Sequence, residues 1–412
     1  MRVLIAGTTY YPALNGQSVF TVNLAEGLAR AGHEVTVLFP EDHASGRVRN
    51  RVRLEALGSI SLRFIHEESF LPVSFGRVRR VFEVFQPDIL HVQDHYPLSV
   101  AAVRLARQLG VNAVGTNHFI PANLAHYVPG AALFAPALER VMWEWMLRLY
   151  RRLDLVAAPS QAAVDLLRAQ GLHVPALAVS CGIDLGRFHP AADVDRRAER
   201  VKFGLHPERT LFISVGRVDR EKRLDVLIKA MAQASRRDLQ LAIAGEGAAS
   251  HELQALTHAL GLQERVRFLG RVPNEELPAL LNSADVFAMA SEAELLSIAS
   301  LEAMASGLPL LLANAMALPE LVTAGSNGYL FEPGSPLDAA RCMELMTGER
   351  DRWQDMGRIS LEKARLHSVK VTVERYAMLY VQVMENSPAP GLSPDPHQRN
   401  RGTEIAHRSG HT

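Results

Sequence analysis

The chain has 412 residues, in which 44 lysines and arginines balance 44 aspartates and glutamates, and 48% of the residues are hydrophobic. This length exceeds one ordinary hydrophobic core, so we expect two domains of a soluble, globular protein. The formal net charge of zero argues against nucleic acid as a partner, because nucleic-acid binding relies on a basic field.

Cysteine content and hydropathy narrow the class further. Cys181 and Cys342 are the only cysteines, so the chain has no disulfide framework and no cysteine-based zinc cluster, which fits a reducing cytosol. No run of about 18 uninterrupted apolar residues occurs. The N-terminal stretch "MRVLIAGTTYYP" lacks a signal-peptide cleavage motif. We therefore expect a cytoplasmic protein whose contact with a membrane is at most peripheral.

The first half of the chain alternates short apolar runs with helical patterns. Strands are predicted at residues 2–7, 34–40, 89–93, 112–118 and 155–160, and helices at 18–32, 99–110 and 138–153. Strands that alternate with helices in this way predict a parallel sheet covered on both faces.

A second series of the same kind starts at residue 210. Its strands are predicted at 210–217, 239–247, 266–270 and 285–291, and its helices at 224–234, 251–261, 277–284 and 298–306. The sequence thus predicts two open α/β domains, at 1–183 and 184–366, joined by a linker rich in glycine, proline and charge at 181–200. Residues 367–386 are expected to form a helix that closes the fold, and the polar, proline-rich tail 387–412 is expected to be disordered.

Candidate site residues follow from the topology. In open parallel sheets the ligand lies beyond the carboxyl ends of the strands, and two such domains facing one another form a cleft. Residues at the carboxyl ends of the predicted strands and on the loops that follow them are therefore candidates: Gly16, Asp94, His95, His118, Arg217, Gly245, Gly247 and Glu294.

The stretch "EAELLSIASLEAMASGLP" places two acids eight positions apart. Ser297 is a good N-cap for the buried helix that follows, and Gly307 can end that helix. Glu294 then lies in the entering loop and Glu302 lies on the helix. A helix N-terminus that emerges from small residues suits an anionic ligand such as a diphosphate. The alternative is that both acids are simply exposed to solvent.

Several motifs in order resemble the retaining GT-B glycosyltransferases of group 1, also called family 4. They read "ELLSIASLEAMASGLP" and "LVTAGSNGYLFEPG", accompanied by "VGRVDREKRLDVLI", "AGEGAA", "FLGRV", "APS" and "CGIDLGRF". The resemblance covers about residues 1 to 385. Two departures stand out. Leu295 and Ser297 replace both glycines of the family's E-G-F-G loop, and Cys181 replaces the family's asparagine.

The resemblance implies a GT-B architecture of two Rossmann-like domains around a central cleft, with the acceptor side in the first and nucleotide-sugar binding in the second. By position, Glu302 would bind the ribose hydroxyls, Glu294 the donated sugar, and Arg217 and Lys222 the diphosphate. His118 matches the family's active-site histidine. The expected donor-binding set also includes Gly16, Gly245, Ser297 and Ile298.

No metal or other cofactor is expected, because two cations and a helix N-terminus already neutralise the leaving diphosphate. The "DVD" at residues 193–195 imitates a metal motif of another glycosyltransferase class, but we interpret it as a solvated loop.

The implied reaction is hexose transfer with retention, in which the donor phosphate takes the acceptor proton. Glu294 would then position the sugar, unlike the nucleophile of a retaining glycosidase.

The acceptor is expected on the first domain, near Asp94, His95 and Asn123. That domain is similar to bacterial enzymes that form glucosyl-diacylglycerols, so UDP-glucose and a diacylglycerol-type lipid are the predicted substrates. Two arginine groups and a Trp-bearing helix could dock on an anionic membrane. They are Arg47, Arg49, Arg51 and Arg53, then Arg77, Arg79 and Arg80, and the helix with Trp143, Trp145 and Leu149.

Other interpretations stay open. The arginines can be merely solvated and the tryptophans part of the core. The acceptor can be a soluble small molecule or a polysaccharide precursor. A sugar-nucleotide epimerase of the same architecture and a nicotinamide oxidoreductase are alternatives from other classes, although no glycine-rich fingerprint follows the first strand.

Overall fold

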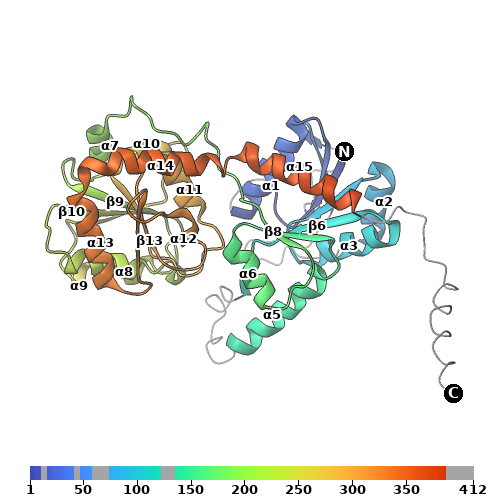
Figure 1. Ribbon diagram of the computed structural model, residues 1–412, viewed down its shortest axis with the longest axis horizontal. Coiled ribbons are helices and arrows are strands. Elements are labelled where there is room, and N and C mark those ends of the chain that lie inside the picture. Colours follow the sequence, from blue (N-terminus) through green and yellow to red (C-terminus); the bar gives the residue numbers. More distant parts are fainter. Residues whose placement is uncertain (11–15, 41–46, 58–73, 122–134, 387–412) are drawn as a thin grey trace, which may run out of the picture.

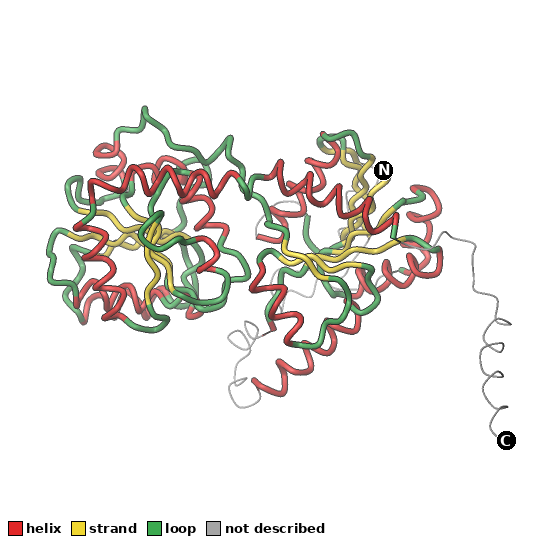
Figure 2. Tube along the Cα trace, in the orientation of Figure 1, coloured by secondary structure: helices red, strands yellow, loops and turns green. Residues whose placement is uncertain are grey.

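The computed structural model describes residues 1–10, 16–40, 47–57, 74–121 and 135–386. Two α/β domains lie side by side along the long axis of the molecule (Figure 1), each with a sheet at its centre and helices on both sides (Figure 2). The predicted acceptor residue Asn123 and the predicted disordered tail lie outside the described residues.

The first domain is built on an eight-stranded sheet with the strand order β3-β4-β2-β1-β5-β6-β7-β8. Its elements are β1 (Arg2–Ala6), α1 (Gly16–Arg30), β2 (Glu34–Pro40), β3 (Arg47–Arg49), β4 (Val52–Leu57), α2 (Phe75–Phe85), β5 (Ile89–Val92), α3 (Pro97–Leu109), β6 (Asn112–Thr116), α5 (Ala135–Tyr150), β7 (Leu155–Ala158), α6 (Gln161–Ala169) and β8 (Ala176–Ala178).

The two faces of the first sheet carry different helices. Side chains alternate along β1, so that Leu4 lies in one buried cluster with residues of α2, α3, α5 and α6. Val3 and Ile5 lie in the other, with residues of α1 and α15 (Val369–Glu385). A run that is apolar on both sides is what a strand covered on both faces requires.

The second domain is built on a six-stranded sheet with the order β11-β10-β9-β12-β13-β14, the 3-2-1-4-5-6 order of a Rossmann fold. Its elements are α7 (Arg196–Lys202), β9 (Thr210–Val215), η2 (Arg220–Lys222), α8 (Leu224–Gln233), β10 (Leu239–Ala244), α9 (Ser250–Ala259), β11 (Val266–Gly270), α10 (Leu277–Ser283), β12 (Val286–Met289), α11 (Ile298–Ala305), β13 (Leu310–Ala313), α12 (Leu318–Leu321), β14 (Gly328–Phe331), α13 (Pro336–Gly348), η3 (Arg350–Arg352) and α14 (Trp353–Arg365).

Two stretches for which the sequence predicted no helix or strand contain regular structure. The arginine run at 47–53 forms an antiparallel hairpin, in which Arg49 pairs with Val52 across the turn. The stretch expected to be a linker packs onto the second domain instead. It contains α7, which Asp195 caps by accepting from the amides of Arg197 and Ala198. The "DVD" stretch thus serves as an exposed helix cap.

The last helix, α15, returns from the second domain to the first and lies along α1 (Figure 1). Its tyrosines reach a buried histidine of β5: His91 Nδ1 lies 2.6 Å from the Tyr380 hydroxyl, and Nε2 lies 2.7 Å from Thr116 Oγ1. The Tyr376 hydroxyl lies 2.8 Å from the same Thr116 oxygen. This satisfied polar network fixes the orientation of α15 on the sheet.

Candidate active site

The first group of predicted residues lies at the carboxyl ends of β9 and β12, adjacent strands where the strand order of the second sheet reverses. Lys222 Nζ lies 2.6 Å from Glu294 Oε1 and 3.7 Å from Glu221 Oε1. Arg217 forms ion pairs with Glu221, at 2.5 Å, and with Asp219. One network therefore connects the cations predicted to hold the diphosphate with the acid predicted to hold the sugar.

Burial differs within this network. Arg217 keeps 56% of its side chain exposed, whereas Lys222 and Glu294 keep only 19% and 11%. Glu221 is a member that the sequence reasoning missed, and its buried Oε2 has no hydrogen-bond partner among the described residues. Its position directly before Lys222 is the one signal that the sequence offers.

The helix α11 begins where the sequence predicts. Ser297 is the N-cap, and its Oγ accepts from the Ser300 amide at 3.0 Å. The amides of Ile298 and Ala299, in the first turn, have no partner within the helix, so they are available to an anionic ligand. Gly307, with φ of +78°, follows the last turn. Glu294 lies in the loop and Glu302 on the helix, as predicted.

Glu302 is the acid with the most unusual environment in the second domain. Burial of its carboxyl raises the pKa from 4.5 to about 7, and the positive charge of Arg187 opposes this shift. The sequence reasoning did not single out Arg187, whose guanidinium donates to the Asn274 carbonyl at 2.6 Å. Near neutral pH the Glu302 carboxyl therefore exchanges between a protonated and an ionised form.

Gly245 and Gly16, two glycines of the predicted site, differ in whether the surrounding structure requires a glycine. Gly245 has φ of +143°, and a Cβ atom there would lie 1.8 Å from the Gly216 carbonyl oxygen. The neighbouring loop after β9 thus requires glycine at 245, whether or not a ligand also approaches there. Gly16 is the first residue of α1, and a Cβ atom there would meet nothing within 4 Å. Their contacts with a donor stay predictions.

In the first domain, His118 follows β6 and is paired with a glutamine. Its Nε2 lies 3.1 Å from Gln93 Oε1, and its ring lies 4.8 Å from the Phe20 ring, centre to centre. Burial lowers the pKa of His118 to about 3. At neutral pH His118 is therefore a neutral imidazole, which can donate or accept a hydrogen bond but carries no charge.

The two predicted acceptor residues that the structure describes are both buried after β5. Asp94 holds its own loop: its carboxylate accepts from the Thr8 amide at 2.6 Å and from Ser99 Oγ at 2.6 Å. His95 has no hydrogen-bond partner for either ring nitrogen among the described residues. The Trp145 ring of α5 lies 4.8 Å from the His95 ring. Contact of either residue with an acceptor stays a prediction.

The tryptophan helix divides between core and surface. Trp143 and Leu149 are buried in the first domain, while Trp145 remains 36% exposed. The core interpretation therefore holds for Trp143 and Leu149, and only Trp145 can contact a partner directly.

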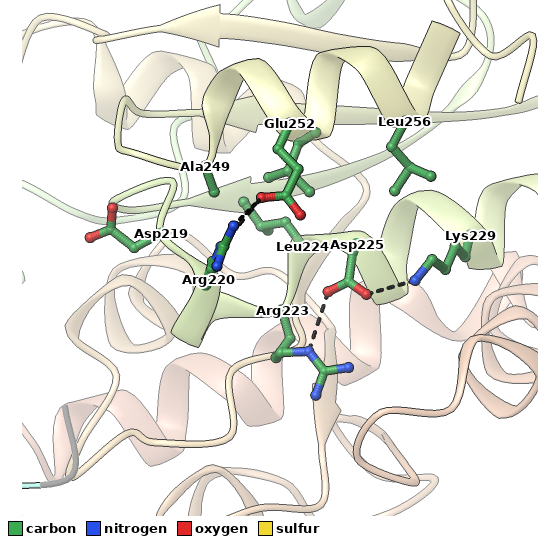
Figure 3. Close-up of a pocket in the computed structure, with 10 residues that line it drawn as sticks. Asp219, Arg220, Arg223, Leu224, Asp225, Lys229, Ala249, Glu252 and Leu256 are labelled. Atoms are coloured by element: carbon green, nitrogen blue, oxygen red, sulfur yellow. Dashed lines mark hydrogen bonds and ion pairs between the residues drawn. The ribbon is translucent and has the colours of Figure 1, made fainter. Parts of the chain in front are cut away.

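A hollow of about 510 Å³ lies in the second domain, between η2, α8 and α9 (Figure 3). Its charged residues neutralise one another: Arg220 pairs with Glu252 at 3.0 Å, and Asp225 pairs with Lys229 at 2.9 Å. Arg217, Lys222, Glu294 and Glu302 are not part of its lining. We therefore assign the candidate site to the strand ends and no role to this hollow.

Two further properties concern only the part of the chain that the structure describes. There, no group of three or more His, Cys, Asp or Glu side chains is arranged to hold a metal ion. Within the same residues, no helix is both long enough and apolar enough to cross a membrane.

Two family profiles match most of the chain. The profile described as "Glycosyltransferase Family 4" matches residues 14–187, and the one described as "Glycosyl transferases group 1" matches residues 195–360. The two matches fall on the two domains of the structure, one on each.

Individual relatives agree with this assignment. The chain is 32% identical over 346 residues to a GDP-mannose-dependent alpha-mannosyltransferase of Mycobacterium tuberculosis, covering 81% of this chain and 84% of the relative. It is 24% identical over 335 residues to the alpha-monoglucosyldiacylglycerol synthase of Streptococcus pneumoniae, covering 80% and 75%.

The fold also matches solved structures. Anabaena HepE, solved in complex with UDP, superimposes with a TM-score of 0.75 at 20% identity, covering 93% of this chain and 100% of HepE. The order of strands, the motifs and the profiles thus agree. The chain belongs to the group 1 (family 4) glycosyltransferases, enzymes of the GT-B fold that move a sugar from a nucleotide sugar to an acceptor.

Proposed function

We propose that this protein is a retaining hexosyltransferase that moves glucose from UDP-glucose to the hydroxyl of a diacylglycerol-type membrane lipid. The observation that carries the donor half is the network of Arg217, Lys222 and Glu294 beside the N-terminus of α11. Two cations and unpaired helix amides together suit a diphosphate, and an adjacent carboxylate suits sugar hydroxyls.

The reaction follows from this arrangement. Arg217, Lys222 and the α11 amides stabilise the charge that develops on the diphosphate as the bond from sugar C1 to phosphate oxygen breaks. The acceptor hydroxyl oxygen forms its bond to C1 on the same face, and its proton passes to the departing phosphate oxygen. Glu294 holds the sugar, and the neutral His118 contacts it from the first domain. No metal has a role in this scheme.

The acceptor half is supported by a relative and by a surface. The pneumococcal relative is named for the synthesis of a glucosyldiacylglycerol. In this chain, the exposed Arg77, Arg79 and Arg80 lie on α2, on the same face of the sheet as α5. The other arginine group contributes less, because Arg49 lies 3.3 Å from Glu26 and Arg53 lies 2.7 Å from Glu55, whereas on α2 Arg79 lies 3.9 Å from Glu83. We therefore propose α2 as the membrane-facing element of a peripheral, cytoplasmic enzyme.

Mannose transfer from GDP-mannose is the second candidate. It is favoured by the mycobacterial mannosyltransferase, the relative with the higher identity of the two compared above. The site described here serves either donor, because the diphosphate is common to both.

A donor screen tests the proposal. The purified protein would be incubated with UDP-glucose or GDP-mannose, with and without diacylglycerol vesicles, and nucleoside diphosphate release and the labelled lipid would be measured. We expect release from UDP-glucose that depends on diacylglycerol, an α-linked product, and full activity in EDTA. Nucleoside diphosphate release from GDP-mannose and not from UDP-glucose would make GDP-mannose the donor in place of UDP-glucose. Loss of activity in EDTA that Mg²⁺ or Mn²⁺ restores would refute the metal-free scheme.

Replacing Arg77, Arg79 and Arg80 together by serine should reduce sedimentation with anionic liposomes. Each arginine near such a surface contributes on the order of 1 kcal/mol, and salt screens the attraction. Binding of UDP should not change, because the predicted donor residues lie in the other domain.

The matched control for this variant replaces Arg197, Arg341 and Arg358, three exposed arginines of the second domain, and alters net charge equally. Equal loss of sedimentation in both triple variants would point to net charge and not to α2. Wild-type protein that stays in the supernatant at low salt would contradict the lipid acceptor and favour a soluble one.

A further inference from the structure

The second domain holds the N-terminus of α6 in the first domain through the carboxylate of Glu320 in α12. Glu320 Oε2 accepts from the Gln161 amide at 3.1 Å, and Oε1 accepts from the Ala162 amide at 2.7 Å. The next amide, of Ala163, donates to the capping Ser160 Oγ at 3.1 Å. Two amides that α6 cannot satisfy internally are thus satisfied by the other domain, and the carboxylate meets the positive end of the helix dipole.

The segment that leads to Glu320 is also tied to the loop that carries Glu294. The Ala317 amide donates to the Glu294 carbonyl oxygen at 3.2 Å. The next residue of the loop, Leu295, is buried in the hydrophobic cluster of the first domain, and Met316 packs against that same cluster. Leu295 stands where the family has glycine. In this chain the Glu294 loop is therefore held between α12 and the first domain.

We infer that Glu320 is a positioning residue for sugar transfer. Its two hydrogen bonds to the Gln161 and Ala162 amides, called the clasp below, hold α6 and thereby align the Glu294 loop with the acceptor domain. This inference rests on the roles proposed above for Glu294 and the first domain. Glu320 is exposed, so water can replace its bonds to α6 when the domains separate. Such a clasp acts on the alignment of the two substrates and leaves the nucleotide contacts unchanged.

Two variants break the clasp from opposite sides. Glu320→Ala removes both hydrogen bonds, and Gln161→Pro removes the amide that donates to Oε2. Proline suits the first helical position, whose N–H has no partner within the helix. Ser160 already has the extended backbone that precedes proline, with φ of −147° and ψ of 168°. Glu275→Ala is the control, since Glu275 is an exposed acid of the same domain.

Kinetics separate a positioning role from a structural one. We expect turnover of UDP-glucose to fall about tenfold in Glu320→Ala and about threefold in Gln161→Pro, with the donor KM within about twofold, because alignment is lost and binding is kept. The double variant should be no slower than Glu320→Ala, since both changes break one contact. The inference would be overturned if the losses of the two single variants multiplied in the double variant, or if the donor KM rose without a fall in kcat.

Amide hydrogen exchange tests the clasp without any assay of activity. In Glu320→Ala, the peptide at the start of α6 should exchange faster than in the wild type, while Glu275→Ala should match the wild type. If the wild type transfers no glucose, the proposed function fails and this comparison still decides the clasp. Unchanged exchange at the start of α6 in Glu320→Ala would overturn it.

Discussion

Replacing Lys222 by methionine is expected to lower turnover about 10²- to 10³-fold, the loss typical when one charge-stabilising donor is removed from the leaving side of a reaction. Its ammonium group lies 2.6 Å from Glu294 and is largely buried. In such a site water does not replace the lost charge. Steady-state kinetics with a saturating nucleotide sugar measure the effect, and turnover within about fivefold of the wild type would contradict the assignment.

Stability has to be separated from catalysis in this experiment. Lys222→Met leaves the buried Glu294 and Glu221 carboxylates without the cation between them, so a loss on the order of 3 kcal/mol of unfolding free energy is expected. Adding Glu294→Gln removes one of these charges and should restore much of the stability but none of the turnover. Lys229→Met is the matched control, because Lys229 pairs with Asp225 at 2.9 Å outside the candidate site and keeps 44% of its side chain exposed.

Glu302→Gln is expected to change the pH dependence of stability by about 3 kcal/mol. The pKa of the carboxyl is about 7 in the folded protein and 4.5 when unperturbed, so the folded state binds the proton more tightly between these values. The stabilisation by this proton is complete below pH 4.5 and is lost as the pH rises through 7, at about 1.4 kcal/mol per unit.

Urea unfolding at pH 5 and pH 8 measures this difference. Glutamine does not titrate, so the stability of Glu302→Gln relative to the wild type should increase from pH 5 to pH 8. Glu292→Gln is the control, because Glu292 is half-exposed and pairs with Arg223 at 2.5 Å. Equal pH dependence in the wild type and in Glu302→Gln would show that the Glu302 pKa is ordinary.

The same carboxyl should link nucleotide binding to proton release. An ionised carboxylate accepts from both hydroxyls of a ribose, so binding favours the form without the proton. The affinity of the wild type for UDP should therefore rise between pH 6 and pH 8, and calorimetry in two buffers should detect a released proton. Glu302→Gln should bind UDP more weakly and without this pH dependence. An unchanged donor KM in the variant would contradict the ribose contact.

Local sequence was sufficient for the elements that carry the second half of the site. Ser297 caps α11 through an amide only three residues away, and Gly307 follows its last turn, so both ends of this helix were predictable from neighbouring residues. The alternation of apolar runs with helical patterns likewise predicted two parallel α/β units. Because strands of one sheet end at a common edge, the same pattern predicted that Arg217 and Glu294 belong to one site.

Family resemblance supplied the roles that the pattern alone left open. The motif around "VGRVDREKRLDVLI" singled out Lys222, and the structure places its ammonium group against Glu294 across 72 positions of sequence. The family resemblance did not single out Glu221 or Arg187, because neither residue stands out in composition or spacing. Glu221 matters because the fold buries it beside Lys222, and Arg187 matters because its charge acts on the pKa of Glu302.

What the sequence by itself determined was the two α/β units, the helix ends and the strand-end positions of the site, because each depends on residues close together in the chain. Only the tertiary structure decided which distant groups meet. Glu320 reaches α6 across 158 positions, and Tyr380 reaches His91 across 289. Such contacts depend on how two finished domains and a returning helix pack, and an exposed glutamate or a tyrosine on an amphipathic helix carries no sequence signal for its partner.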